Sequence, residues 1–168
     1  MIDPRFLQVL HTIHERLSDS AVSWALTGSL GFALQGVPVE PHDIDIQTDE
    51  VGAYAIEERL SEWVSSRVNF SSTERIRSHF GALTIGGIRV EIMGAIQKRL
   101  EDGTWEDPVD LACHKRIVEV EGMRVPVLSL EYEVQAYRKL GRFERAALLE
   151  EWLRRDADRR VSAASESA

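Results

Sequence analysis

At 168 residues the chain is long enough for one domain or a core with a small appendage, and 43% hydrophobic residues suffice for a soluble core. Twenty basic against 28 acidic residues give a formal net charge of −8, which argues against broad, non-specific nucleic-acid binding, because such binding needs a basic surface. With a single cysteine, no bilayer-length apolar run and no signal-peptide pattern, the sequence predicts a cytoplasmic protein outside the membrane.

The N-terminal segment predicts a helix, because Asp3 can cap it and Pro4 suits its first turn. His11 and His14 lie three residues apart on this helix, a spacing at which two side chains could bind a metal. No carboxylate motif surrounds them, so we expect a solvated or partly packed pair instead.

A strand-to-helix turn is predicted at Gly28-Ser29, where an extended run (22–26) gives way to a helical one (30–34). A helix N-terminus offers unpaired N–H groups and partial positive charge to a phosphate. Gly28 lets the backbone approach a ligand closely, and Ser29 can cap the helix or donate its hydroxyl to a phosphate oxygen. A glycine-serine pair alone is usually only a turn, so a functional interpretation needs a second motif.

That second motif is Asp43 and Asp45, two residues apart in an extended segment. Both side chains should leave the same face of a strand, while Ile44 and Ile46 face the core. Neighbouring carboxylates repel each other without a cation, and Mg²⁺ is bound by such oxygens together with substrate phosphates. We therefore predict a magnesium site here, although the same acidic pattern is also common in solvated loops.

Downstream, a helix is predicted over 49–63 and an edge strand over 64–70, followed by a hairpin of 80–85 and 88–93. Glu91 lies in the second arm of this hairpin. A lone charged residue in an apolar strand usually faces solvent. Because we expect the hairpin beside the strand of Asp43, we favour a metal site shared by all three acids.

The second half of the chain carries fewer functional signals. Trp105 lies in a charged loop. Its ring could stack on the acceptor or on the nucleotide base, and the equal alternative is an aromatic residue that anchors the loop at the surface. A second hairpin is predicted over 116–128, followed by a helix capped by Ser129 and a last helix ending near residue 155. The predicted organisation is a core over 1–128, a helical extension over 129–160 and a disordered tail over 161–168.

In their order these motifs resemble the nucleotidyltransferase superfamily that includes DNA polymerase beta and the antibiotic nucleotidyltransferases. The shared signature is Gly-Ser or Gly-Gly on a strand-helix turn, then Asp-hydrophobic-Asp-hydrophobic on the next strand and a third acid on a later strand. Here it reads Gly28-Ser29, Asp43-Ile44-Asp45-Ile46 and Glu91. The layout is most similar to small lincosamide- and aminoglycoside-type enzymes and their uncharacterised relatives. This resemblance implies an α+β fold, with a mixed β-sheet flanked by helices and a short helical C-terminal part.

The resemblance also implies the chemistry. Asp43, Asp45 and Glu91 would be the catalytic and metal-binding residues, holding two Mg²⁺ ions about 3.5–4 Å apart. ATP or another nucleoside triphosphate would place its β and γ phosphates on Gly28-Ser29. An acceptor hydroxyl would attack the α-phosphorus and displace pyrophosphate. Glu91 is either a third metal ligand or the general base, and the sequence does not separate these roles.

Fixed cations are expected near the triphosphate. Arg75 and Arg77 before the first hairpin, and Arg138 and Lys139 on the penultimate helix, are the candidates. We favour Arg77 and Lys139, the latter because family architecture implies that its helix could fold back over the site.

A small hydroxylated or aminated molecule is the expected acceptor, and AMP the expected transferred group. The run Leu30-Gly31, where minimal family members have small polar or Arg-containing residues, leaves the acceptor class open. One alternative is a tRNA or partner protein in a toxin–antitoxin or phage-defence pair, although the acidic composition counts against tRNA. Another is a non-catalytic nucleotide-binding module. The sequence also leaves open a homodimer with acceptor pockets across its interface.

Overall fold

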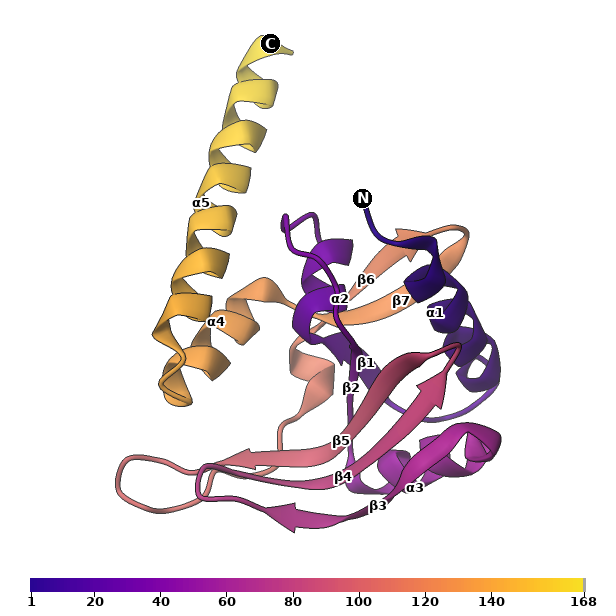
Figure 1. Cartoon of the computed structure of the whole chain (residues 1–168). Helices are drawn as coiled ribbons and strands as arrows, with labels where there is room; N and C mark the ends of the chain where they lie inside the picture. Colours follow the sequence, from indigo (N-terminus) through magenta and orange to yellow (C-terminus); the bar gives the residue numbers. More distant parts are fainter. Residues whose placement is uncertain (168) are drawn as a thin grey trace. The chain divides into compact units, whose positions relative to one another are not determined.

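The computed structural model describes residues 1–167, which fall into two compact units. The first unit is Met1–Leu128, and the second begins at Ser129. In chain order the elements are α1 (Pro4–Leu17), β1 (Trp24–Thr27), α2 (Gly28–Leu34), β2 (Ile44–Thr48), α3 (Glu50–Arg59), η1 (Ser61–Trp63), β3 (Val64–Ser72), β4 (Ile76–Ile85), β5 (Ile88–Lys98), η2 (Leu111–Cys113), β6 (Lys115–Val120), β7 (Met123–Leu128), α4 (Leu130–Lys139) and α5 (Phe143–Glu166) (Figure 1).

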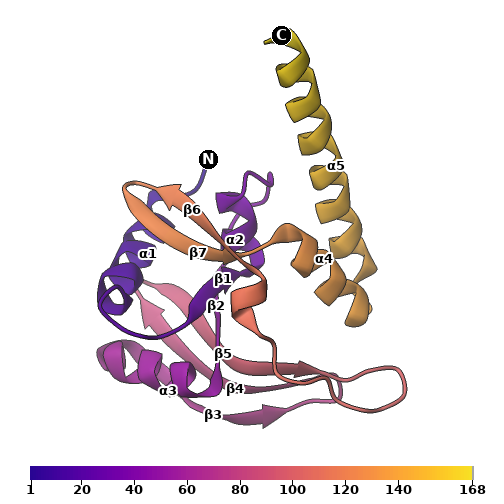
Figure 2. The ribbon, with the colours of Figure 1, turned by 180° about the vertical axis from the view of Figure 1, so that it is seen from behind.

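Seven strands of the first unit form one mixed sheet in the order β3-β4-β5-β2-β1-β7-β6. β1 is antiparallel to β2, whereas β2 runs parallel to β5 and β1 parallel to β7. Figure 2 shows β2 between β1 and β5 in the middle of the sheet. This mixed sheet with flanking helices confirms the predicted α+β fold, and the β4–β5 hairpin lies beside β2 as expected.

The hydrophobic core lies on one face of the sheet, beneath α1 and α3. Alternate residues of β2 and β5 enter this core together with the apolar sides of the two helices. The fully buried core residues of these two helices and two strands are Leu10, Ile13, Ala53, Ile56, Ile44, Ile46, Val90 and Ile92. The intervening residues of β2 and β5 therefore leave the sheet on its other face.

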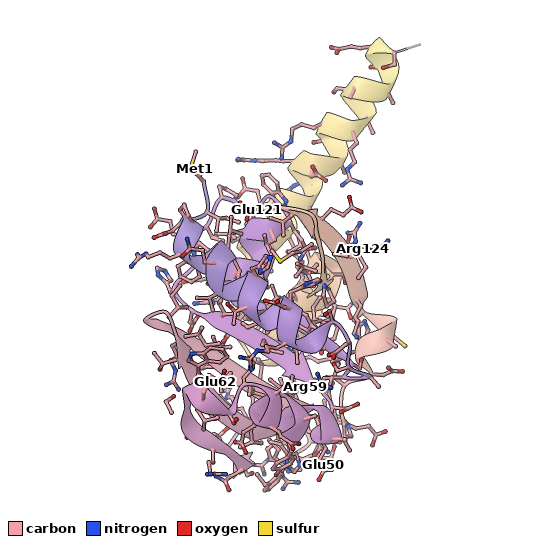
Figure 3. All side chains as sticks on the ribbon, turned by 90° about the vertical axis from the view of Figure 1, so that its right-hand side faces the viewer. Met1, Glu50, Arg59, Glu62, Glu121 and Arg124 are labelled. Atoms are coloured by element: carbon pink, nitrogen blue, oxygen red, sulfur yellow. The ribbon has the colours of Figure 1, made fainter. Side chains whose placement is uncertain are left out.

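Polar contacts connect the ends of the two core helices. Arg16, in the last turn of α1, donates to Glu62 at 2.6 Å, and Arg59 at the end of α3 donates to Asp19 at 2.7 Å. Arg59 and Glu62 are labelled in Figure 3, near the α1–α3 side of the unit. Arg16 and Arg59 also donate to each other's backbone carbonyls, at 2.9 and 3.0 Å, so these contacts help to hold the ends of α1 and α3 together.

Two elements extend further than the sequence predicts. The β4–β5 hairpin continues to Lys98, and a β-bulge interrupts it where Ala95 adopts a positive φ of 51°. In the second unit α4 is capped by Ser129, which accepts from the Tyr132 N–H, and α5 continues to Glu166. The helix thus covers most of the tail for which the sequence predicts disorder.

Among the described helices, none has both the length and the apolarity needed to cross a membrane.

Candidate functional site

The turn between β1 and α2 is built around a glycine. β1 ends at Thr27 and α2 begins at once with Gly28, whose φ of +69° lies in the left-handed region. A Cβ at this position would also stand 2.3 Å from Oδ2 of Asp45. Both backbone conformation and space therefore require glycine here.

The two aspartates lie at the same end of the sheet as this turn. Asp43 immediately precedes β2 and Asp45 lies within it, opposite Thr27 in the antiparallel register. Ser29 connects the two segments, because its Oγ accepts a hydrogen bond of 3.2 Å from the backbone N–H of His42. The loop before the aspartates is thus held against the start of α2.

The third acid reaches this site through the parallel pairing of β2 with β5. Glu91 is the register partner of Asp45, so both side chains leave the same face of adjacent strands. Asp43, Asp45 and Glu91 are all half-buried, and each offers an oxygen within 4.8 Å of the other two. The structure therefore brings together three residues that are distant along the chain.

The chemistry of this donor set fits Mg²⁺. All three ligands are carboxylates, whose hard oxygens Mg²⁺ prefers, and the cluster contains none of the histidine or cysteine ligands typical of zinc. Three negative charges this close also repel one another, so a cation between them would be stabilising. The arrangement can hold a divalent cation beside the glycine turn.

An arginine outside the predicted set of site residues contacts the cluster. Arg89 lies two residues before Glu91 on β5, and its Nε donates to Oε1 of Glu91 at 2.8 Å. The signal for it was present in the sequence, since residues two apart in a strand share a face.

Arg77 is not brought to the acids. It pairs with Gln97 on β5, six residues beyond Glu91 and roughly 20 Å away along the strand. Its guanidinium lies over the ring of Trp105, 4.0 Å from Cζ to the ring centroid, and its Nε is buried without a hydrogen-bond partner within residues 1–167. The guanidinium of Arg77 therefore already covers one face of the Trp105 ring. Lys139 lies in the last turn of α4, in the second unit.

A cavity of about 580 Å³ lies at the opposite end of β1 and β2 from the acids. Its lining includes Ser23 and Asp49, which flank the Trp24–Thr48 pair, whereas the acids lie beside the Thr27–Asp45 pair. Charged groups of both signs line it, and none of the predicted site residues does.

Comparison with known proteins identifies relatives of the chain. Residues 9–152 match the family model of aminoglycoside-2''-adenylyltransferase. A crystal structure of a candidate nucleotidyltransferase from Thermotoga maritima is 66% identical, with a TM-score of 0.82, over 92% of this chain and 96% of that one. No curated protein matches the sequence at a significant level.

More distant solved structures share the fold. The lincosamide antibiotic adenylyltransferase LnuA, bound to lincomycin, is 13% identical with a TM-score of 0.53, over 87% of this chain and 97% of that one. The antibiotic-resistance factor ANT(2'')-Ia in solution is 19% identical with a TM-score of 0.56, over 99% and 97%. At these identities the likeness concerns the fold alone.

Proposed function

This chain belongs to the aminoglycoside-2''-adenylyltransferase family and is a nucleotidyltransferase, and we propose that it transfers AMP from ATP to a hydroxyl of a small-molecule acceptor. Pyrophosphate is the second product. The observation that carries the proposal is the convergence of Asp43, Asp45 and Glu91 within 4.8 Å beside the glycine turn.

In this proposal the three carboxylates hold Mg²⁺. When bound, Mg²⁺ would neutralise charge on the phosphates and lower the pKa of a coordinated hydroxyl. Asp43 and Asp45 are ligands, and Glu91 fits two roles, ligand and proton acceptor, both of which need its carboxylate beside Asp45.

The glycine turn receives the triphosphate tail. Gly28 has no side chain, so phosphate oxygens can approach the backbone. Ser29 Oγ already accepts a hydrogen bond from the His42 N–H, which leaves its own proton to donate to a phosphate oxygen. Arg77, stacked on Trp105, has no part in this proposal.

The proposed reaction breaks one phosphoanhydride bond of ATP and forms one phosphoester bond to the acceptor. The acceptor oxygen attacks the α-phosphorus, an O–P bond forms, and the bond from the α-phosphorus to the bridging oxygen of the β-phosphate breaks. The hydroxyl proton passes to Glu91 or to water, and pyrophosphate leaves. Water exclusion and alignment by the turn would favour this in-line displacement.

A small acceptor is favoured by the relatives. LnuA was solved with lincomycin, and ANT(2'')-Ia was solved with adenylyl-2''-tobramycin. A net charge of −8 also suits a cationic acceptor.

The test is pyrophosphate release from ATP and Mg²⁺ in the presence of aminoglycosides, lincosamides and unrelated polyols, with mass spectrometry of the acceptor. We expect acceptor-dependent release that falls by at least about a hundredfold in Asp45→Asn. Glu119→Gln, which removes an exposed carboxylate of β6, is the matched control and should retain wild-type turnover. Nucleotide binding without release for any acceptor, or label transferred instead to a protein or RNA of a lysate, would contradict the proposal.

A further inference from the structure

We infer that Arg89 is a positioning residue for Glu91 and fixes the third carboxylate in the orientation in which it meets Asp43 and Asp45. The inference rests on the proposed function, because it concerns the same metal-binding acids.

The contact is local and directional. Arg89 and Glu91 lie on the same face of β5, and the Arg89 Nε–H donates to Oε1 of Glu91 at 2.8 Å. Hydrogen bonds between a guanidinium and a carboxylate are shorter and stronger than neutral ones. Nε–H is the inner donor of the guanidinium, so the bond fixes the carboxylate close to the strand.

Glu91 needs such a restraint more than the two aspartates do. A glutamate side chain has one more rotatable bond than an aspartate, and ordering it costs more conformational entropy. The Glu91 side chain is 24% exposed, so packing alone leaves it some freedom. Partners that orient a metal ligand typically change metal affinity by about 10–100-fold.

Arg89 also carries a positive charge, which opposes a nearby cation. Its side chain is 53% exposed, so water and salt screen this repulsion. The hydrogen bond from Arg89 orients Glu91 by direct contact, and salt does not screen this effect in the same way. We therefore expect loss of Arg89 to weaken metal binding rather than to strengthen it.

The experiment titrates the full-length protein with Mn²⁺ and follows free Mn²⁺ by electron paramagnetic resonance. The variants are Arg89→Met, Arg89→Lys, Glu91→Gln and the double variant Arg89→Met/Glu91→Gln. Arg5→Met is the matched control, because Arg5 also donates from Nε to an acid two residues away, Asp3, on a helix that packs under the other face of the sheet.

We expect Arg89→Met to weaken Mn²⁺ binding about tenfold and Arg5→Met to leave it unchanged. Arg89→Lys keeps the charge without the inner N–H donor and should restore the affinity only in part. The double variant should bind like Glu91→Gln alone, because the effect of Arg89 passes through Glu91. Melting temperatures should stay close to wild type, and Arg89→Gln is the substitute if Arg89→Met does not fold.

Unchanged or tighter Mn²⁺ binding in Arg89→Met would overturn the inference, as would additive effects in the double variant. Either result would leave the proposed function standing if wild type binds Mn²⁺ and Asp45→Asn does not. Failure of wild type to bind Mn²⁺ would overturn the metal site and this inference together.

Discussion

Asp45 packs against Gly28 so closely that a Cβ on residue 28 would stand 2.3 Å from Oδ2 of Asp45. The contact follows from the antiparallel pairing of β1 and β2, which sets Asp45 opposite Thr27. The acid that we propose as a metal ligand is thus held against the turn that we propose as the phosphate cradle. Only glycine permits this approach.

Gly28→Ala should lower both stability and turnover. The positive φ costs an L-residue about 1 kcal/mol, and the Asp45 carboxylate must turn away from the new Cβ and so from its place beside Asp43 and Glu91. Gly87→Ala is the control, since Gly87 also has a positive φ of 77° but no atom within 4 Å of its Cβ position. Urea denaturation of both variants separates the two effects. Equal stability of the two, with full turnover in Gly28→Ala, would show that the contact is unimportant.

Ala95→Gly should stabilise the protein by about 0.5–1 kcal/mol, because Ala95 has a φ of 51° at the bulge of β5 and glycine adopts this conformation without strain. Ala82→Gly is the control. Ala82 is buried in β4 at an ordinary φ, and its replacement should destabilise by a similar amount. Chemical denaturation measures both, and a destabilised Ala95→Gly variant would refute the prediction.

Lys115 should make stability depend on pH in the alkaline range. Burial lowers the pKa of Lys115 below its ordinary 10.5, while Asp49 opposes this shift. Between the folded pKa and 10.5 the unfolded chain binds more protons than the folded one, so stability gains from this group as the pH rises. The free energy of unfolding of wild type should therefore increase relative to that of Lys115→Met between pH 7.5 and 10.5.

Lys139→Met controls for the loss of one lysine in that experiment. The measurement is the free energy of unfolding in urea at both pH values. A free energy of unfolding of wild type that stays constant, or falls, relative to that of Lys115→Met as the pH rises would contradict the predicted sign.

Strand periodicity and one resemblance were enough to predict the three acids. Asp43 and Asp45 share a face because they are two residues apart, and the hairpin of Glu91 lies beside them. The same periodicity would have indicated Arg89. The family and the fold class that the motifs implied are confirmed.

Arg77 lies away from the acids because the hairpin continues to Lys98 and Arg77 pairs with Gln97, six residues beyond Glu91. A β-bulge in the same stretch is also not predicted from the sequence. Between the pairs His79–Gly94 and Arg77–Gln97, β4 has one residue and β5 has two. The extra residue changes which β5 side chains share a face with Glu91 beyond the bulge. Alanine rarely occupies the left-handed conformation, so nothing at Ala95 signals the bulge in the sequence.

The C-terminal helix differs from the prediction for another reason. The serine- and alanine-rich composition after residue 160 predicts disorder, but alanine and glutamate favour helix and the segment directly continues a helix rich in arginine, leucine and glutamate. α5 therefore continues from its packed first turns to Glu166.

Anomalous diffraction at the manganese edge, from crystals soaked with Mn²⁺ and a non-hydrolysable ATP analogue, tests the metal site most directly. We predict a peak within about 2.0–2.3 Å of carboxylate oxygens of Asp43 and Asp45, with Glu91 in or next to the ligand shell and the phosphates against Gly28-Ser29. A nucleotide bound elsewhere, or a peak that avoids all three carboxylates, would contradict the proposed function.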